Sequence, residues 1–280
     1  MVLFDFKKNF MSRCELVAEI GWNHMGDMAL AEKMISEASK SGVEYCKFQT
    51  WKVKNLKDGP WNTDGRLEIY NKAELSDQDH SKLVDLCKKH KVNFLTSVFN
   101  VKDIEFVSKL SNEAIKIPSH EVYNLNLIKE ACKKFKKIFI SVGACKWEEF
   151  NNILKLDIDL NKVFFMHCVS SYPLTDENVN FPKLLEIKKK HSQIGYSGHL
   201  KGVDDAIAAI SFGAMIVEKH FTIDNDLPGR DNKFALLPED MKIISNYRDI
   251  FSKMNIDKGL DVQECEMDIY KNYRGRWSKN

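Results

Sequence analysis

Short apolar runs alternate regularly with amphipathic stretches along the 280 residues of this chain, and this pattern limits the folds that it can adopt. The runs are rich in Ile, Val and Phe and alternate only weakly with polar residues, as strands buried on both faces do. There are eight of them, at residues 14–21, 43–50, 93–99, 114–119, 137–143, 162–169, 193–199 and 215–222. A strand and then a helix, repeated eight times over roughly 240 residues, predicts an α/β fold of the (β/α)8 type, the TIM barrel. A doubly wound open sheet is the alternative, but no GxGxxG turn follows the first run.

The stretches between the runs carry signals for helices. Apolar residues at helical spacing lie within 30–38 and within 203–210, and Gly213 follows the second stripe at a position typical of a C-cap glycine. Residues 238–253 begin with Pro-Glu-Asp, which suits a helix N-terminus. The long connection at 51–75 is expected to cover a site, as long loops in compact domains often do.

We expect residues 1–255 to form the barrel and residues 256–280 to form a C-terminal tail or linker without a second domain. Hydrophobic residues make up 44% of the chain, which is enough for a sizeable core. The formal net charge is +2 with 29% charged residues, so the two signs nearly cancel. This balance indicates neither nucleic acid nor a membrane surface as a partner, and an anionic ligand must be held by a few local cations.

None of the seven cysteines forms a CxxC pair. Cys14, Cys46 and Cys168 lie inside apolar runs, where we expect reduced thiols of the core, and this suits a reducing cytoplasm. The N-terminus lacks the pattern of a secretory signal, and no apolar stretch approaches the ~20 residues of a membrane span. We therefore expect a soluble cytoplasmic protein.

Polar and titratable side chains gather at the C-terminal ends of the apolar runs, where (β/α)8 barrels carry their active sites. They are Glu19, Lys47, Gln49, Ser97, Lys116, Ser119, Glu121, Ser141, His167, Ser197, His199, Glu218 and His220. A buried charge is costly without a partner, so mutually satisfied ion pairs would explain any one of them. They do not explain a set to which every strand contributes at the same end. We therefore expect one shared site.

Two lysines in nearby runs, Lys47 and Lys116, offer cations to a ligand. Together with nearby hydroxyl groups they suit a small, doubly anionic molecule such as a phosphorylated carboxylate. The hydroxyl groups belong to Ser97, Ser119, Ser141 and Ser197.

Two histidines close the last two runs, His199 in GYSGH and His220 in VEKHFT. Side chains at positions i and i+2 of a strand point to the same face, so Glu218 accompanies His220. Two imidazoles beside a carboxylate suit a divalent metal with open positions, although histidines of the core or surface are the alternative. Glu19 and Glu121 are candidates for proton transfer.

Six motifs, in order and spacing, resemble the barrel domain of the N-acetylneuraminate synthase family, whose members make sialic, legionaminic and pseudaminic acids. They are AEIGWNH (18–24), KFQT (47–50), KIPSHE (116–121), HCVSSYP (167–173), GYSGH (195–199) and VEKHFT (217–222). The resemblance covers about residues 14–255. It implies a metal-dependent condensation of phosphoenolpyruvate with the aldehyde of an open-chain amino sugar such as N-acetylmannosamine, with release of phosphate.

The resemblance also implies roles by position. His199 and His220 would hold the metal, which is Mn²⁺ by expectation, with Mg²⁺ or Co²⁺ as alternatives. Catalytic roles would fall to Glu19, Glu121 and Glu218. Phosphoenolpyruvate would be bound by Lys47, Ser97, Lys116, Ser119, Ser141 and Ser197. The sugar would face Gln49, Ser170, Tyr172 and Asp231, and the family implies a homodimer.

Several positions depart from the family pattern. Pro118 and His120 stand where glycines are common, which implies a reshaped phosphoenolpyruvate pocket, and Ser170 replaces an asparagine that meets the sugar. Gly198 stands where aspartate is common, and its missing charge beside His199 implies a weaker or differently tuned metal site. Full-length relatives continue into an antifreeze-like domain that reaches the sugar across a dimer. We expect either an acceptor that lacks the group this domain recognises, or a second chain that supplies it.

Two other functions fit the same residues. One is a Schiff-base aldolase on the same barrel, with Lys116 or Lys47 as the nucleophile. The other is a catalytically inactive scaffold or binding protein, which Gly198 and Pro118 favour. The paired histidines argue against the aldolase, and the costly buried charges argue against the scaffold.

Overall fold

Eight parallel strands form a closed barrel in the computed structural model, which describes residues 13–277. Each strand pairs with the next along the chain, and β1 also pairs with β8 to close the ring. The strands are β1 (Glu15–Gly21), β2 (Tyr45–Thr50), β3 (Asn93–Val98), β4 (Ala114–Ile117), β5 (Lys137–Ser141), β6 (Val163–Cys168), β7 (Ile194–Gly198) and β8 (Ile216–His220). Each lies within one of the eight predicted runs, and the TIM-barrel prediction is confirmed.

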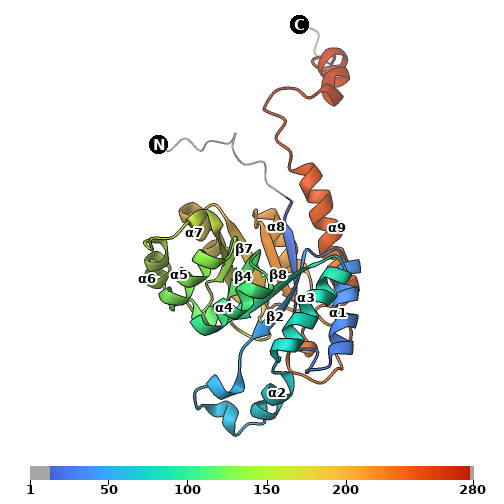
Figure 1. Ribbon diagram of the computed structural model, residues 1–280. Coiled ribbons are helices and arrows are strands. Elements are labelled where there is room, and N and C mark those ends of the chain that lie inside the picture. The colour runs from blue at the N-terminus through green and yellow to red at the C-terminus, as the bar shows by residue number, and fades with distance from the viewer. Residues whose placement is uncertain (1–12, 278–280) are drawn as a thin grey trace.

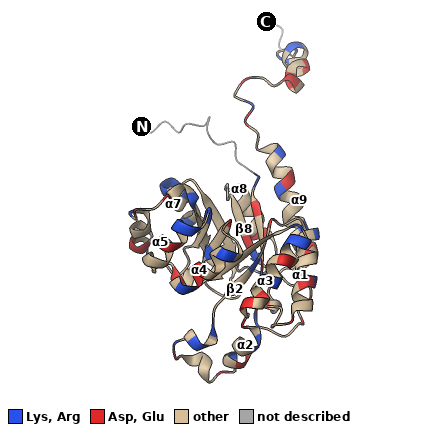
Figure 2. Cartoon of the chain, viewed as in Figure 1, with Lys and Arg blue, Asp and Glu red and all other residues tan. Residues whose placement is uncertain are grey.

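Helices surround the barrel, as Figure 1 shows. They are α1 (Met28–Lys40), α2 (Arg66–Ala73), α3 (Asp77–Lys89), α4 (Val101–Leu110), α5 (Leu125–Lys134), α6 (Trp147–Leu154), α7 (Phe181–Lys190), α8 (Asp204–Ser211) and α9 (Pro238–Met254). Lys and Arg are interspersed with Asp and Glu over these helices (Figure 2). Within residues 13–277, no helix combines the length and the apolar character that a membrane crossing needs.

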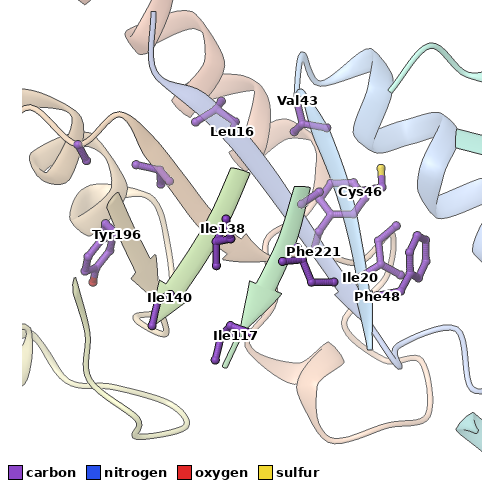
Figure 3. Close-up of a cluster of buried hydrophobic side chains, with 14 of the residues drawn as sticks. Leu16, Ile20, Val43, Cys46, Phe48, Ile117, Ile138, Ile140, Tyr196 and Phe221 are labelled. Atoms are coloured by element: carbon purple, nitrogen blue, oxygen red, sulfur yellow. The ribbon is translucent and has the colours of Figure 1, made fainter. Parts of the chain in front are cut away.

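The main core lies between the strands and the helices. Outward-facing strand residues such as Cys46, Ile138 and Ile140 are fully buried there (Figure 3). The helices present apolar stripes to them, and in α1 the buried stripe includes Met34 and Ile35. This packing explains the weak alternation in the sequence, because strand residues are covered on both faces.

The inside of the barrel has its own apolar layer. Tyr45, Leu95, Phe139, Phe164 and Met166 are buried in this inner cluster. The next inward position along several strands, two residues further, is polar. Because successive side chains of a strand alternate between its faces, the polar positions all project into the C-terminal mouth of the barrel.

Two segments leave the regular pattern. Residues 51–75 form η2 (Val53–Asn55), η3 (Pro60–Asn62) and α2, at the end of the barrel where the strands finish (Figure 1). Beyond α9, residues 255–277 are exposed except for the partly exposed Met267, and they carry η8 (Glu264–Glu266) and the short π-helix η9 (Ile269–Tyr273). This last segment extends from the opposite end of the barrel (Figure 1).

Candidate active site

Five of the predicted site residues meet inside the mouth of the barrel. Lys47 Nζ lies 2.8 Å from Glu19 Oε2 and 3.6 Å from Glu218 Oε1. Lys116 Nζ donates to both oxygens of Glu218, at 2.9 and 3.1 Å. Ser197 Oγ donates to Glu218 Oε1 at 3.0 Å. These residues come from β1, β2, β4, β7 and β8, and all are buried, so the cluster spans the barrel.

Two cations and two anions make this cluster formally neutral. Burial by itself raises the pKa of Glu218, but the ammonium groups of Lys116 and Lys47 outweigh it and the pKa falls to about 2. Burial also raises the pKa of Glu19, and Lys47 offsets this only in part. Gln49 Nε2 donates to Glu19 Oε1 at 2.9 Å. Glu218 is therefore a fixed anion, and Glu19 is the carboxyl group of the cluster that is better able to bind a proton.

The two predicted metal ligands lie side by side at this mouth. The rings of His199 and His220 have centroids 5.5 Å apart. The Nδ1 of His199 donates to the carbonyl oxygen of Val169 at 2.9 Å, which assigns the lone pair of this ring to Nε2. The nearest acidic atom to His220 Nδ1 is Asp231 Oδ2, at 3.8 Å. The ring of Tyr172 covers His199 with a centroid distance of 4.2 Å.

The donor set fits an open divalent-metal site. Burial lowers the pKa of His220 well below its ordinary value, which favours the neutral imidazole that binds metals, whereas contacts with Cys168 outweigh burial and raise the pKa of His199. Among residues 13–277, no group of three or more His, Cys, Asp and Glu side chains gathers as a metal site. A cation would therefore take two ligands, His199 and His220, and keep positions open for oxygen donors.

Hydroxyl groups border one side of the cluster. Ser141 Oγ is buried and has no hydrogen-bond partner among the described residues. Gly143 follows it, and a Cβ there would lie 2.5 Å from Ser170 Oγ and 2.7 Å from Ser119 Oγ. Ser97 is buried and pairs in register with Lys116. A buried hydroxyl without a partner is costly, so this side is suited to the oxygens of a ligand.

Aromatic side chains border the other side, and sequence reasoning missed them. Trp51 Nε1 donates to Gln49 Oε1 at 3.2 Å, and Trp22 Nε1 donates to Asp231 Oδ2 at 2.7 Å. Tyr70 of α2 stacks on Trp22, with centroids 5.2 Å apart, and meets Trp51 edge-on at 5.7 Å. The position of Trp51, two residues after Gln49, was the available signal. No pattern in the sequence around Tyr70 indicates its contacts with Trp22 and Trp51.

The sequence model of the NeuB family matches residues 34–257 of this chain. The chain belongs to the NeuB family. It is 32% identical to an N,N'-diacetyllegionaminic acid synthase of Campylobacter jejuni over 250 residues, 84% of this chain and 75% of the relative. It is also 32% identical to an N-acetylneuraminate-9-phosphate synthase of Drosophila melanogaster over 88% of this chain and 74% of the relative.

A solved structure agrees with this assignment. The sialic acid synthetase of Leptospira borgpetersenii, determined with citrate, superposes with a TM-score of 0.84 at 26% identity. The match covers 95% of this chain and 93% of that one. The resemblance inferred from the motifs is thus confirmed.

One histidine of this NeuB-family chain does not belong to the site. His167 faces outward from β6, where its Nε2 bonds the carbonyl oxygen of Val179 at 2.8 Å. Grouping it with the mouth residues was wrong by one position of strand alternation. Its neighbour Cys168 faces inward, with Sγ 3.5 Å from Ser119 Oγ and 4.0 Å from His199 Nδ1.

Cys168 is a free, buried thiol as expected, but it lies at the mouth and not in the main hydrophobic core. Cys14 and Cys46 do belong to the main hydrophobic core. Cys168 Sγ also lies 3.9 Å from Ser170 Oγ, a predicted sugar-facing residue. The spacing of two between Cys168 and Ser170 was the signal for a shared face.

Glu121 lies at the edge of the mouth rather than in the charged cluster. It closes the short helix η4 (Ser119–Glu121) and is partly exposed. Asn124 Nδ2 donates to Glu121 Oε2 at 3.2 Å. Among the described residues, Glu121 makes no contact with Lys47 or Lys116, and its catalytic role stays a prediction.

The expected effect of Gly198 on the metal site is not what the structure shows. A Cβ at this position would point outward, 2.4 Å from Asp205 Oδ2 and 2.5 Å from the Tyr196 ring. The missing side chain therefore does not face His199, and a carboxylate from α8 occupies the place that it would take. The inference of a charge lost beside the metal ligand is wrong.

Proposed function

We propose that this NeuB-family chain condenses phosphoenolpyruvate with the open-chain aldehyde of an amino sugar, N-acetylmannosamine-like or related. The products are a 3-deoxy-2-keto sugar acid of the sialic acid type and inorganic phosphate. The names of the relatives, an N,N'-diacetyllegionaminic acid synthase and an N-acetylneuraminate-9-phosphate synthase, support this reaction class. The observation that carries it is the Lys–Glu cluster at the mouth, next to two facing imidazoles.

The cluster and the serines form the phosphoenolpyruvate site. Lys47 and Lys116 supply the cations, and Ser141 supplies a buried hydroxyl whose partner would be a ligand oxygen. The remaining hydroxyls come from Ser97, Ser119 and Ser197. Since the two glutamates already neutralise the lysines, binding of the anion requires each ammonium group to exchange a carboxylate contact for one to the ligand. This exchange lowers the affinity for every anion, the substrate included.

The proposed reaction forms a carbon–carbon bond and cleaves the bond between C2 of phosphoenolpyruvate and its phosphate oxygen. The C3 carbon of phosphoenolpyruvate bonds to the aldehyde carbon, whose oxygen takes a proton. Water adds to C2, and cleavage of the C2–O bond releases phosphate and leaves the 2-keto acid. Glu19 is suited to move the proton, because burial raises its pKa while Lys47 and Gln49 hold its two oxygens. Glu218 stays ionised and orients Lys116.

A divalent cation held by His199 and His220, which we take to be Mn²⁺ with Mg²⁺ or Co²⁺ as alternatives, would supply Lewis-acid polarisation of the aldehyde. The chain itself fixes the ligands. The hydrogen bond from His199 to Val169 sets the tautomer, and the ring of Tyr172 limits how that imidazole can turn.

The sugar is placed on the aromatic side. Gln49, Tyr172 and Asp231 offer an amide, a phenol and a carboxylate there, and Ser170 offers a hydroxyl near Cys168. Glu121, at the edge of the mouth, is placed to meet the far end of the acceptor. We also propose a homodimer, supported by exposed apolar side chains on α9 such as Ile250 and Met254, and a cytoplasmic location, supported by seven unpaired cysteines.

The test is phosphate release from phosphoenolpyruvate with Mn²⁺ and a panel of hexosamines, with and without a chelator. We expect turnover with at least one N-acetylated hexosamine, its loss on chelation, and its loss in His220→Ala. The matched control is His90→Ala, a partly exposed histidine that follows α3. No turnover with any aldose, or full activity in His220→Ala, contradicts the proposal.

The same preparation separates the two other functions. A pyruvate adduct trapped by borohydride on Lys116 or Lys47 would support the Schiff-base aldolase, because the proposed reaction leaves no covalent bond to the protein. Calorimetric titration with Mn²⁺ addresses the scaffold, which would show no site-specific binding.

A further inference from the structure

A second buried ion pair lies directly behind the two metal-binding histidines. Lys219 is the residue of β8 between Glu218 and His220, and its side chain points away from the barrel interior. Its Nζ donates to both oxygens of Asp205, at 2.7 and 2.8 Å. The side chains are 2% and 0% exposed, so neither charge can be satisfied by water.

Asp205 connects three elements of the fold. It lies in the first turn of α8 and accepts a hydrogen bond from its neighbour Ala206 N at 2.8 Å. It also accepts one from the hydroxyl of Tyr196 on β7, at 3.0 Å. With Lys219 on β8, one carboxylate therefore fixes α8 to both strands that carry the histidines.

The lysine extends this connection to the backbone beside His199. Lys219 Nζ also donates to the carbonyl oxygen of Leu200 at 2.7 Å. On the other side, the carbonyl of His199 itself accepts from Leu174 N at 3.0 Å. Gly198 and Lys219 form the last residue pair between β7 and β8. His199 and His220 each follow directly after a residue of this pair, which the network holds in place.

Gly198 is part of the same arrangement. Any Cβ there would lie 2.4 Å from Asp205 Oδ2 and 3.1 Å from Lys219 Cδ, so the glycine makes room for the carboxylate. The converse follows from the same geometry. A carboxylate carried by residue 198 itself could reach Lys219 only if Asp205 gave up its place.

We propose that Asp205 is a positioning residue for the metal site: through Lys219, it holds the strand ends of His199 and His220 at the separation that a shared cation requires. This inference rests on the proposed function, because it needs the two histidines to bind one metal. Asp205 touches neither histidine among the described contacts. Its effect is therefore on metal affinity rather than on the chemistry of the ligands. Outer-shell groups that bond a ligand directly typically change metal affinity by about 10- to 100-fold, and Asp205, which acts through Lys219, is expected at the lower end of this range.

The test moves the carboxylate from one element to another. Asp205→Ala is expected to raise the Kd for Mn²⁺, measured calorimetrically on the full chain without substrates, by about tenfold. The double variant Gly198→Asp/Asp205→Ala places a carboxylate in the vacated space and is expected to restore the Kd to within about threefold of the parent. Asp205→Asn, which keeps the shape and loses the charge, serves as the milder variant if alanine impairs folding.

A control separates positioning from stability. Glu44→Ala breaks the ion pair of Glu44 with the buried Arg248, outside the mouth. It is expected to lower the unfolding midpoint and leave the Kd for Mn²⁺ unchanged. Parent-like Mn²⁺ affinity in Asp205→Ala and Asp205→Asn overturns the inference while leaving the proposed function intact. A parent chain that binds no Mn²⁺ overturns the proposed metal site and this inference together.

Discussion

Lys116 and Glu218 come from β4 and β8, half a barrel apart, yet their charged groups are in contact at 2.9 Å. Neither side chain could be buried alone, because an isolated charge in the barrel would shift to its neutral form. The pair also sets the protonation of the site, since Glu218 remains ionised while burial lowers the pKa of Lys116 and Glu218 offsets this only in part. The same contacts that allow burial therefore hold the charged groups on which the proposed anion site depends.

A double variant tests whether this pair is more than structural. Lys116→Met leaves Glu218 without its main cation and is expected to lower the free energy of unfolding by about 3–5 kcal/mol. Lys116→Met/Glu218→Gln removes both charges and should recover part of that loss, while phosphoenolpyruvate binding stays absent in both. Urea unfolding and calorimetry measure the two effects. The surface variant Lys109→Met is the control, and equal stability of the single and double variants would contradict the interpretation.

Sequence alone located most of these residues but not their partners. A lysine or glutamate inside an apolar run, as Lys47 and Glu218 are, is informative because burial demands compensation. The error at His167 and the omission of Cys168 have one origin. A strand turns successive side chains to opposite faces, so a position mistaken by one residue changes which of the two enters the mouth.

Among the elements, α2 is the one whose role could not be inferred from its own residues. The prediction that residues 51–75 cover a site named no contacts. These depend on Tyr70 meeting Trp51 at the start of the same segment and Trp22 in the loop after β1. The two indole groups in turn donate to Asp231 and Gln49. Through Tyr70, α2 therefore contacts the two indole groups that bond Asp231 and Gln49, side chains proposed to face the sugar.

Tyr70→Ala is expected to weaken the acceptor side alone. Each aromatic contact is worth about 0.5–1.5 kcal/mol, so losing two removes about 1–3 kcal/mol and should raise the KM for the aldose by about fivefold to 100-fold. The KM for phosphoenolpyruvate should change less than twofold, because the lysines are untouched. Tyr70→Phe keeps both ring contacts and should behave as the parent. Tyr247→Ala, which removes a tyrosine stacked on Phe251 in α9, is the control, and equal changes in both KM values would contradict the idea.

For the whole molecule, the barrel followed from the sequence because its signal is repeated. Because eight runs carry the same pattern, an error in one of them leaves the fold prediction intact. A single contact such as that between Lys219 and Asp205 has no such repeated pattern in the sequence. Helix boundaries such as those of α9 were predicted closely, since proline and acidic residues mark its N-terminus. The structure of residues 255–277 carried no periodic signal and was expected only as a tail or linker.

Four histidines in different parts of the fold share one response to pH, whereas the pKa of His199 at the mouth is raised. Burial lowers the pKa of His24 to about 4, and it also lowers the pKa values of His80, His167 and His191. His24 is fully buried, accepts a hydrogen bond from Gly26 N at 3.0 Å and keeps its Nε2 without a partner among the described residues. The folded chain therefore binds protons at these sites less readily than the unfolded chain does.

The sign of the pH dependence follows from linkage. A histidine with a lowered pKa in the folded state is fully compatible with folding above pH ~6.5, and stability falls as the pH drops from there towards 4. For His24 the loss at pH 5, relative to pH 8, is about 2 kcal/mol. We expect urea unfolding to show this fall in the parent and a shallower slope in His24→Gln. His90→Gln, at a partly exposed imidazole, should keep the parent slope, and an unchanged slope in His24→Gln would show that its burial does not control proton binding.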